Sequence, residues 1–209
     1  MKTALIAGSS GLIGQHLLKE LLASEQYAKV ISLVRREQDL NHPKLEQRII
    51  DFENLSATDL KADHVFCTLG TTIKKAGSKE AFRKVDEEYP LSLATQAQKQ
   101  GAQLFAIVTA MGSNPDSFFF YNQVKGELEQ ALKKLNYTHL GVFKPSMLMG
   151  DREESRLGES VGQAVMSAVQ FLLPANTKPI EGKKVAKAMI QYAKSPKTGL
   201  SEILSGEMQ

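Results

Sequence analysis

Tyr121 and Lys125, four residues apart, are the pair in this sequence best suited to proton transfer. On a helix the two side chains lie on one face, about one turn apart. A nearby ammonium favours the phenolate form of a tyrosine. The spacing therefore predicts a general acid/base for a reacting carbonyl or alcohol, with Tyr121 and Lys125 as catalytic residues. The alternative is a surface tyrosine that happens to lie beside a lysine.

A glycine-rich segment near the N-terminus is suited to binding phosphate. It follows an apolar run over 3–7 and precedes a helical pattern over 12–22. Glycines there permit a tight turn and a close approach of backbone to pyrophosphate, which then faces free N–H groups at the helix start. The segment predicts a dinucleotide site, and the alternative is a turn that only packs. Its residues are Gly8, Ser9, Ser10, Gly11, Leu12, Ile13 and Gly14.

The end of the second apolar run indicates which dinucleotide binds. NAD sites usually carry a carboxylate there, whereas this chain has Arg35 and Arg36. Guanidinium groups suit a 2′-phosphate, so NADP(H) is favoured over NAD(H). Two alternatives stay open: solvated arginines, and a ribose contact from Glu37 or Asp39. Asp51 and Phe52 follow the third run, where a carboxylate would accept a hydrogen bond from the adenine amino group; a plain loop aspartate is the alternative.

Short apolar runs alternate with amphipathic segments, which predicts an α/β fold with a doubly wound parallel sheet, the Rossmann fold. Pro90 predicts a break or kink near Tyr89 within the helical segment 78–100. A polar loop over 151–159, where a lid is one interpretation, precedes the helix 160–172. Strands are expected at 3–7, 30–34, 48–50, 64–69, 104–109, 140–143 and, short, at 203–204, and further helices at 12–22, 121–135 and 183–194.

The length of 209 residues predicts one domain, with a core dinucleotide-binding part over 1–150 and a small C-terminal lobe on the substrate side over 151–209. A net charge of +3 does not indicate nucleic-acid binding. No apolar stretch approaches the roughly 20 residues of a membrane span, and a single cysteine, Cys67, suits a reducing compartment, so we expect a cytoplasmic protein. The four scattered histidines predict no metal site.

The whole sequence resembles the short-chain dehydrogenases, most closely the atypical members similar to the Tat-interacting oxidoreductase-like proteins. Three segments carry the resemblance: the glycine turn, the run from Tyr121 to Glu127, and Lys144-Pro145-Ser146 with 150–156. It implies that Tyr121 is the acid/base and that Lys125 also binds the nicotinamide ribose. It also implies that Leu69, Gly70, Thr71, Pro145 and Ser146 line the cofactor.

The sequence departs from these relatives at the catalytic serine. Thr109 stands where a serine usually ends the fifth strand, and Ser113 lies about a turn too late. Threonine keeps a hydroxyl that can bind a substrate oxygen, so Thr109 is the third candidate catalytic residue. Phe118, Phe119 and Phe120 follow, either as a wall of the substrate pocket or as core.

These observations favour an NADPH-dependent oxidoreductase acting on a small carbonyl or alcohol of unknown identity. The first alternative is an NADPH-binding sensor with little or no turnover that presents a surface to a protein partner. The second is an NAD-dependent epimerase or dehydratase. A homodimer is a further expectation.

Overall fold

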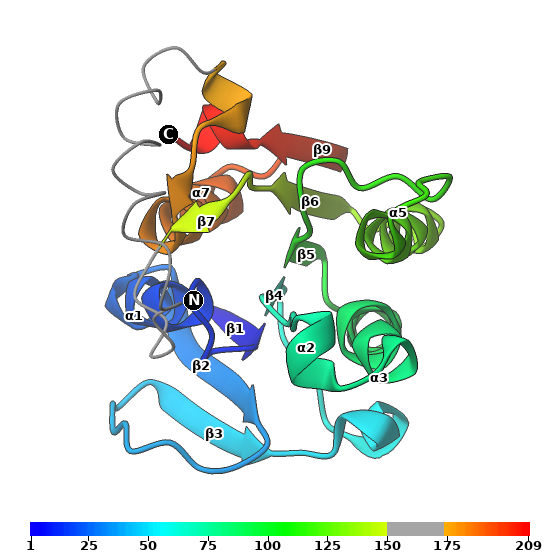
Figure 1. Ribbon diagram of the computed structural model, residues 1–209. Helices are drawn as coiled ribbons and strands as arrows, with labels where there is room; N and C mark the ends of the chain where they lie inside the picture. Colours follow the sequence, from blue (N-terminus) through cyan, green and yellow to red (C-terminus); the bar gives the residue numbers. More distant parts are fainter. Residues whose placement is uncertain (150–173) are drawn as a thin grey trace.

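The computed structural model describes residues 1–149 and 174–209. The expected polar loop over 151–159 and helix over 160–172 lie outside these residues. A parallel sheet of seven strands forms the centre of the protein, with helices on both faces (Figure 1). The predicted doubly wound Rossmann architecture is confirmed.

The strands of this sheet follow the expected apolar runs with adjusted bounds. They are β1 (Lys2–Ala7), β2 (Tyr27–Val34), β3 (Leu45–Ile49), β4 (His64–Cys67), β5 (Leu104–Val108), β6 (His139–Lys144) and β9 (Gly199–Leu204). A second, two-stranded sheet pairs β7 (Leu148–Met149) with β8 (Ile180–Glu181). The α-helices are α1 (Gly14–Ala23), α2 (Ile73–Ala76), α3 (Lys79–Arg83), α4 (Tyr89–Lys99), α5 (Phe120–Lys133) and α7 (Gly182–Lys194).

The strand order is β3-β2-β1-β4-β5-β6-β9, and every neighbouring pair is parallel. The carboxyl ends of all seven strands therefore lie at one edge of the sheet. The order reverses between β1 and β4, which is where such sheets bind ligands. The glycine turn follows β1 at this point.

The chain after residue 174 belongs to the main layers. α7 packs beside α1, and β9 pairs with β6 over its full length, His139 opposite Gly199 and Lys144 opposite Leu204. The expected short strand at 203–204 is thus a six-residue edge strand. Its alternating half-buried and exposed residues explain why its apolar signal was weak.

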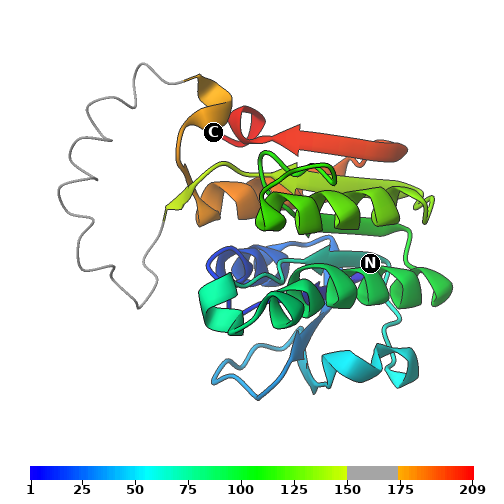
Figure 2. The same ribbon diagram turned by 45° about the vertical axis from the view of Figure 1, so that its right-hand side comes forward.

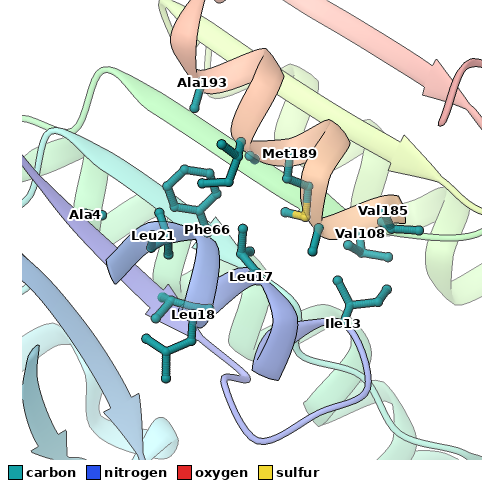
Figure 3. Packing of buried hydrophobic residues seen from close by; sticks show 14 of the residues in the cluster. Ala4, Ile13, Leu17, Leu18, Leu21, Phe66, Val108, Val185, Met189 and Ala193 are labelled. Atoms are coloured by element: carbon teal, nitrogen blue, oxygen red, sulfur yellow. The ribbon is translucent and has the colours of Figure 1, made fainter. Parts of the chain in front are cut away.

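The five inner strands, β1, β2, β4, β5 and β6, each contribute to two cores because successive side chains point to opposite faces. Ala4 and Ile6 join α1 and α7, whereas Leu5 and Ala7 face α4 and α5. Figure 3 shows the first core, where Leu17 and Leu21 of α1 meet Met189 of α7. Figure 2, turned by 45°, shows α4 and α5 running along the opposite face.

The segment from α3 to α4 continues through a π-helical turn, Lys84–Glu88, and is not broken. Proline at position 90 has no N–H, and its ring clashes with the carbonyl of Asp86 four residues earlier. The wider turn removes this conflict: Tyr89 N–H bonds to the Lys84 carbonyl five residues back. The expected irregularity near Tyr89 is therefore a π-turn, and it moves Asp86 into a buried position.

His64 lies buried at the start of β4, between two polar partners. Its Nε2 is 2.8 Å from Lys2 Nζ, and its Nδ1 is 2.9 Å from Tyr27 Oη. Because an ammonium can only donate, Nε2 accepts and the Nδ1–H donates to Tyr27. Burial, with the Lys2 charge, lowers the pKa of His64 from 6.5 to about 4.

This environment predicts acid sensitivity. The pKa of His64 is lower in the folded than in the unfolded chain, so its contribution to stability is complete above pH 6.5 and is lost as the pH falls toward 4. The shift corresponds to about 3 kcal/mol. Urea unfolding between pH 7 and pH 4.5 should show the decrease, and His64→Gln should have a shallower pH dependence. Equal slopes for both proteins would contradict the assignment.

Within residues 1–149 and 174–209, no helix combines the length and apolar character that crossing a bilayer requires.

Candidate active site

The glycine turn is closely packed, and its shape depends on the absence of side chains. Gly8 has a φ of 90°. A Cβ on Gly14 would lie 2.0 Å from the Gly8 carbonyl oxygen. Thr68, which follows β4, donates its hydroxyl to the carbonyls of Ala7 and Gly8, both at 3.1 Å. These contacts join the turn to the loop after β4.

The turn presents backbone donors, as a phosphate site must. The N–H groups of Leu12 and Ile13 donate to no acceptor among the described residues. No acidic side chain stands in the first turn of α1. The free N–H groups and the positive end of the helix dipole fit a dinucleotide pyrophosphate.

Ser9 and Ser10 differ in their environments. Ser9 is buried, and its Oγ accepts from the Ser32 hydroxyl at 2.8 Å and from Gln38 Nε2 at 3.3 Å. Its hydroxyl thus holds the turn to β2, and only its backbone faces a ligand. Ser10 is exposed.

Arg35 and Arg36 directly follow β2 and are both exposed. The next residues border a hollow of about 410 Å³, lined by Glu37, Gln38, Asp39, Leu40, Asn41, Leu45 and Gln47. Reciprocal hydrogen bonds between Gln38 backbone and the Gln47 amide, at 2.8 and 2.9 Å, fix this loop. Arg35, Arg36, Glu37 and Asp39 thus all belong to the loop that follows β2, and Glu37 and Asp39 line the hollow.

Asp51 and Phe52 have structural roles in this fold. The Asp51 carboxylate caps the 3₁₀ helix Phe52–Ala57 by accepting from the Glu53 N–H at 3.0 Å. The Phe52 ring is buried and stacks on Tyr89 at 5.7 Å between centroids. Both follow β3, which is two strands from β1 in the sheet, and the adenine contact of Asp51 stays a prediction.

Tyr121 and Lys125 share one face of α5, as their spacing predicts. Tyr121 is 38% exposed, open enough to reach a ligand, and its ring packs on Phe82 at 5.7 Å between centroids. Lys125 is buried beneath it and close enough for the two groups to interact electrostatically. The pair thus places an accessible phenol above a buried ammonium.

A buried carboxylate, Asp86, holds this ammonium. Lys125 Nζ lies 2.8 Å from Asp86 Oδ1, and Asp86 Oδ2 accepts from the Thr71 N–H at 2.8 Å. Burial works against the Lys125 charge, but the Asp86 carboxylate keeps the pKa of Lys125 above its usual range. Leu69, Gly70 and Thr71, expected along the cofactor, are half-buried or exposed at this edge, and Asp86 ties them to α5.

The expected role of Thr109 in orienting substrate does not match its side-chain contact. The Thr109 hydroxyl is buried and donates to Glu129 Oε1 at 2.7 Å. Glu129 lies eight residues beyond Tyr121 on α5, about two turns away. The acceptor of the Thr109 hydroxyl therefore lies about two helical turns along α5 from Tyr121. Ser113, the other candidate, donates to the Ala110 carbonyl at 2.7 Å.

Glu129 is buried and belongs to a partly exposed charge network that the sequence did not indicate. Its other oxygen lies 2.8 Å from Lys144 Nζ, which is 3.2 Å from Glu202 Oε2. Burial opposes the charge of Lys144, but the two carboxylates hold its pKa above the usual range. This network joins α5, β6 and β9 beneath the site.

The loops after β5 and β6 meet at the same edge of the sheet. Pro145 is buried, and its carbonyl accepts from the Met111 N–H at 2.9 Å. Ser146 donates its hydroxyl to the Lys178 carbonyl. Of the expected Pro145-Ser146 pair, Pro145 thus binds the loop after β5, and the Ser146 hydroxyl binds the C-terminal segment.

The three phenylalanines before Tyr121 do not form core together. Phe118 is fully exposed and Phe119 is 75% exposed, whereas Phe120 packs on Phe82 at 5.8 Å. Several other exposed apolar side chains come from the segments that follow β4, β5 and β6: Ile73, Met111, Met147 and Met149. The core interpretation therefore fails for Phe118 and Phe119, and the site has an apolar rim.

Asp86 is the main site residue that sequence reasoning missed. It lies four residues after Phe82 and four before Pro90, on the buried stripe of a helical segment. One sequence feature could have identified Asp86: it is a charged residue on an apolar helical stripe, one turn before a proline.

The fold and the glycine turn together define a dinucleotide-binding protein with a Rossmann sheet. The family model described as NAD(P)H-binding matches residues 8–196. The chain belongs to this NAD(P)H-binding family. The predicted resemblance to atypical short-chain dehydrogenases and Tat-interacting proteins is confirmed.

Curated relatives match along most of the chain. Protein HTATIP2 from Rattus norvegicus is 34% identical over 218 residues, covering 99% of this chain and 87% of the relative. A Candida albicans relative named Protein FMP52, mitochondrial, is 31% identical over 197 residues, covering 90% of this chain and 86% of the relative.

Solved structures share the fold at low sequence identity. A UDP-N-acetylglucosamine 4-epimerase from Methanobrevibacter ruminantium M1, in complex with UDP-N-acetylmuramic acid, has a TM-score of 0.71 and 18% identity, covering 97% of this chain and 76% of that one. The human epimerase family protein SDR39U1 with NADPH has a TM-score of 0.64 and 17% identity, covering 97% and 74%. At these identities the likeness concerns the fold alone.

Proposed function

We propose that this protein is an NADPH-dependent oxidoreductase that transfers hydride to or from a carbonyl or alcohol. The observation that carries the proposal is the Tyr121–Lys125 pair on α5, at the same sheet edge as the glycine turn. When bound, the nicotinamide supplies the hydride. Tyr121 exchanges the proton with the substrate oxygen, and Lys125 supports the phenolate and binds the ribose.

The cofactor would rest with its pyrophosphate on the glycine turn and its nicotinamide beside Leu69, Gly70 and Thr71. The exposed side chains of Phe118, Phe119 and Met111 favour substrates with apolar groups next to the carbonyl. The direct test is oxidation of NADPH by purified protein with a panel of aryl, alkyl and polar aldehydes and ketones. We expect aryl and alkyl carbonyls to be reduced fastest, and the absence of turnover with every carbonyl would overturn the proposal.

Preference for NADPH is proposed on Arg35 and Arg36, exposed where the adenosine ribose would lie. Loss of a charge-assisted hydrogen bond to a 2′-phosphate costs about 1.5–3 kcal/mol. Arg35→Ala should therefore weaken NADPH binding by about tenfold or more, with NADH binding unchanged. Arg36→Ala should show the same pattern to a smaller degree. Equal affinities of the wild type for both nucleotides would instead favour ribose binding by Glu37 or Asp39.

A second candidate, an NADPH-binding sensor without turnover, is favoured by the contact of Thr109 with Glu129. That bond uses the hydroxyl proton that would otherwise be donated to a substrate oxygen. NADPH binding in the absence of turnover, with a protein partner whose affinity depends on NADPH, would support the sensor. An affinity for the partner that does not depend on NADPH would contradict the sensor proposal.

A cytoplasmic location is also a proposal. The Candida albicans relative is named mitochondrial.

A further inference from the structure

Asp86 occupies an unusual position for a carboxylate. Asp86 is 1% exposed within the π-turn between α3 and α4, and Lys125 opposite is 3% exposed. One oxygen lies 2.8 Å from the Lys125 ammonium, and the other accepts from the Thr71 N–H at 2.8 Å. The carboxylate therefore connects three parts of the site: the π-turn, the loop after β4 and the Tyr121 face of α5.

A buried ammonium needs such a partner. Removal of a lysine from water favours the neutral amine, unless a negative charge lies close. Within the part of the chain that the structure describes, the titratable groups that act on the charge of Lys125 are Asp86 from the π-turn, Tyr121 from its own helix and Cys67 from β4. Burial raises the pKa of the Cys67 thiol to about 12, so this group is neutral. Glu129, one turn along α5, is bound to Thr109 and Lys144 instead.

Among the described residues, Asp86 is thus the one carboxylate paired with Lys125. We propose that Asp86 is a positioning residue that keeps the Lys125 ammonium charged and fixed beneath Tyr121, and ties it to the loop Leu69–Thr71. The proposal rests on the proposed function, because the charge on Lys125 matters through the proton affinity of Tyr121. Asp86 acts through Lys125 and does not itself touch the substrate.

The Tyr121 phenol can be titrated without substrate or cofactor. The chain has five tyrosines. Burial raises the pKa of Tyr27, of Tyr137, of Tyr192 and, to about 12, of Tyr89, where a hydrogen bond to Glu53 adds to the shift. The phenolate absorbance of wild type minus that of Tyr121→Phe therefore reports Tyr121 itself.

The decisive variant is Asp86→Asn, which keeps an acceptor for the Thr71 N–H and removes the charge. Lys125 should then lose its proton, and the Tyr121 titration should move upward by about one pH unit or more. If the protein turns over, its pH–rate profile should move the same way, with a larger effect on kcat than on KM. A titration that stays in place or moves downward would overturn the proposal.

A double-mutant cycle separates this role from a structural one. In a Lys125→Met background, Asp86→Asn should no longer raise the Tyr121 titration, because no ammonium remains to be held. An equal upward shift in both backgrounds would overturn the proposal. Glu88→Gln, an exposed change in the same turn, is the matched control and should leave the titration unchanged.

Should Asp86→Asn fail to fold, NMR of the Lys125 side chain in the wild-type protein gives the answer. We expect an ammonium at pH 9, and a neutral amine there would overturn the proposal. These measurements do not depend on the carbonyl panel. If no carbonyl is turned over but Asp86→Asn still raises the Tyr121 titration, the result counts against the oxidoreductase proposal alone.

Discussion

Gly14→Ala is expected to abolish NADPH binding and to lower the free energy of unfolding by about 1–3 kcal/mol. The new Cβ would lie 2.0 Å from the Gly8 carbonyl oxygen and 2.8 Å from the Thr68 hydroxyl oxygen. Neither neighbour can move freely, since Thr68 donates to that same carbonyl. Relief of the clash requires α1 to move away from the turn, which displaces the N–H groups of Leu12 and Ile13.

NADPH fluorescence suits this measurement because the chain contains no tryptophan. The titration is paired with urea unfolding of the same samples. Gln15→Ala, an exposed change one residue further along α1, is the matched control and should leave both quantities near wild type. Wild-type NADPH affinity in Gly14→Ala would show that the nucleotide binds elsewhere, and both the enzyme and the sensor proposals would then fail.

Tyr121→Phe is expected to reduce kcat for carbonyl reduction by about 10²–10⁴-fold, the usual contribution of a positioned acid/base. The phenyl ring keeps the packing on Phe82, so fold and NADPH affinity should stay within about twofold of wild type. Rates are measured at saturating NADPH with the fastest carbonyl of the panel. A large loss of kcat with an unchanged NADPH affinity is the result that identifies Tyr121 as the proton donor.

Tyr89→Phe serves as the control for this variant. Its hydroxyl donates to Glu53 at 2.7 Å, and its ring stacks on Phe52 below β3. It should therefore keep wild-type kcat. If Tyr121→Phe turns over as fast as wild type, then a different group supplies the proton, and Tyr121 would have to be removed from the mechanism.

The two variants also distinguish the candidate functions. A sensor requires the glycine turn but not the phenol hydroxyl, so Gly14→Ala would impair it and Tyr121→Phe would not. An oxidoreductase requires both. The Thr109 hydroxyl donates to Glu129, so Tyr121 would have to act without the usual neighbouring hydroxyl. The comparison of the two variants tests whether it can.

The order of elements and the glycine turn were predictable because they depend on local patterns. An apolar run that ends at Gly8 and a helical repeat from Ile13 to Leu22 indicate a strand, a turn and a helix without knowledge of the rest of the chain. The shared face of Tyr121 and Lys125 follows in the same way from their spacing by four residues. These predictions agree with β1, α1 and α5.

Local patterns did not predict the full length of the edge strand β9 or its place in the sheet. Its sequence, Gly-Leu-Ser-Glu-Ile-Leu, contains no continuous apolar run, and half of its residues are exposed. Only parallel pairing with β6, some 60 residues earlier, determines that it completes the sheet. A pairing at that separation depends on topology, which local composition does not contain.

By itself, the sequence determined that this protein has a Rossmann sheet, a phosphate-binding turn and a tyrosine four residues before a lysine. The tertiary structure alone decided the partners of the buried groups. Asp86 meets Lys125 from 39 residues away, and Thr109 turns to Glu129. Buried charges and hydroxyls must bind whatever polar group the fold brings within about 3 Å, and that choice is made only when distant elements pack together.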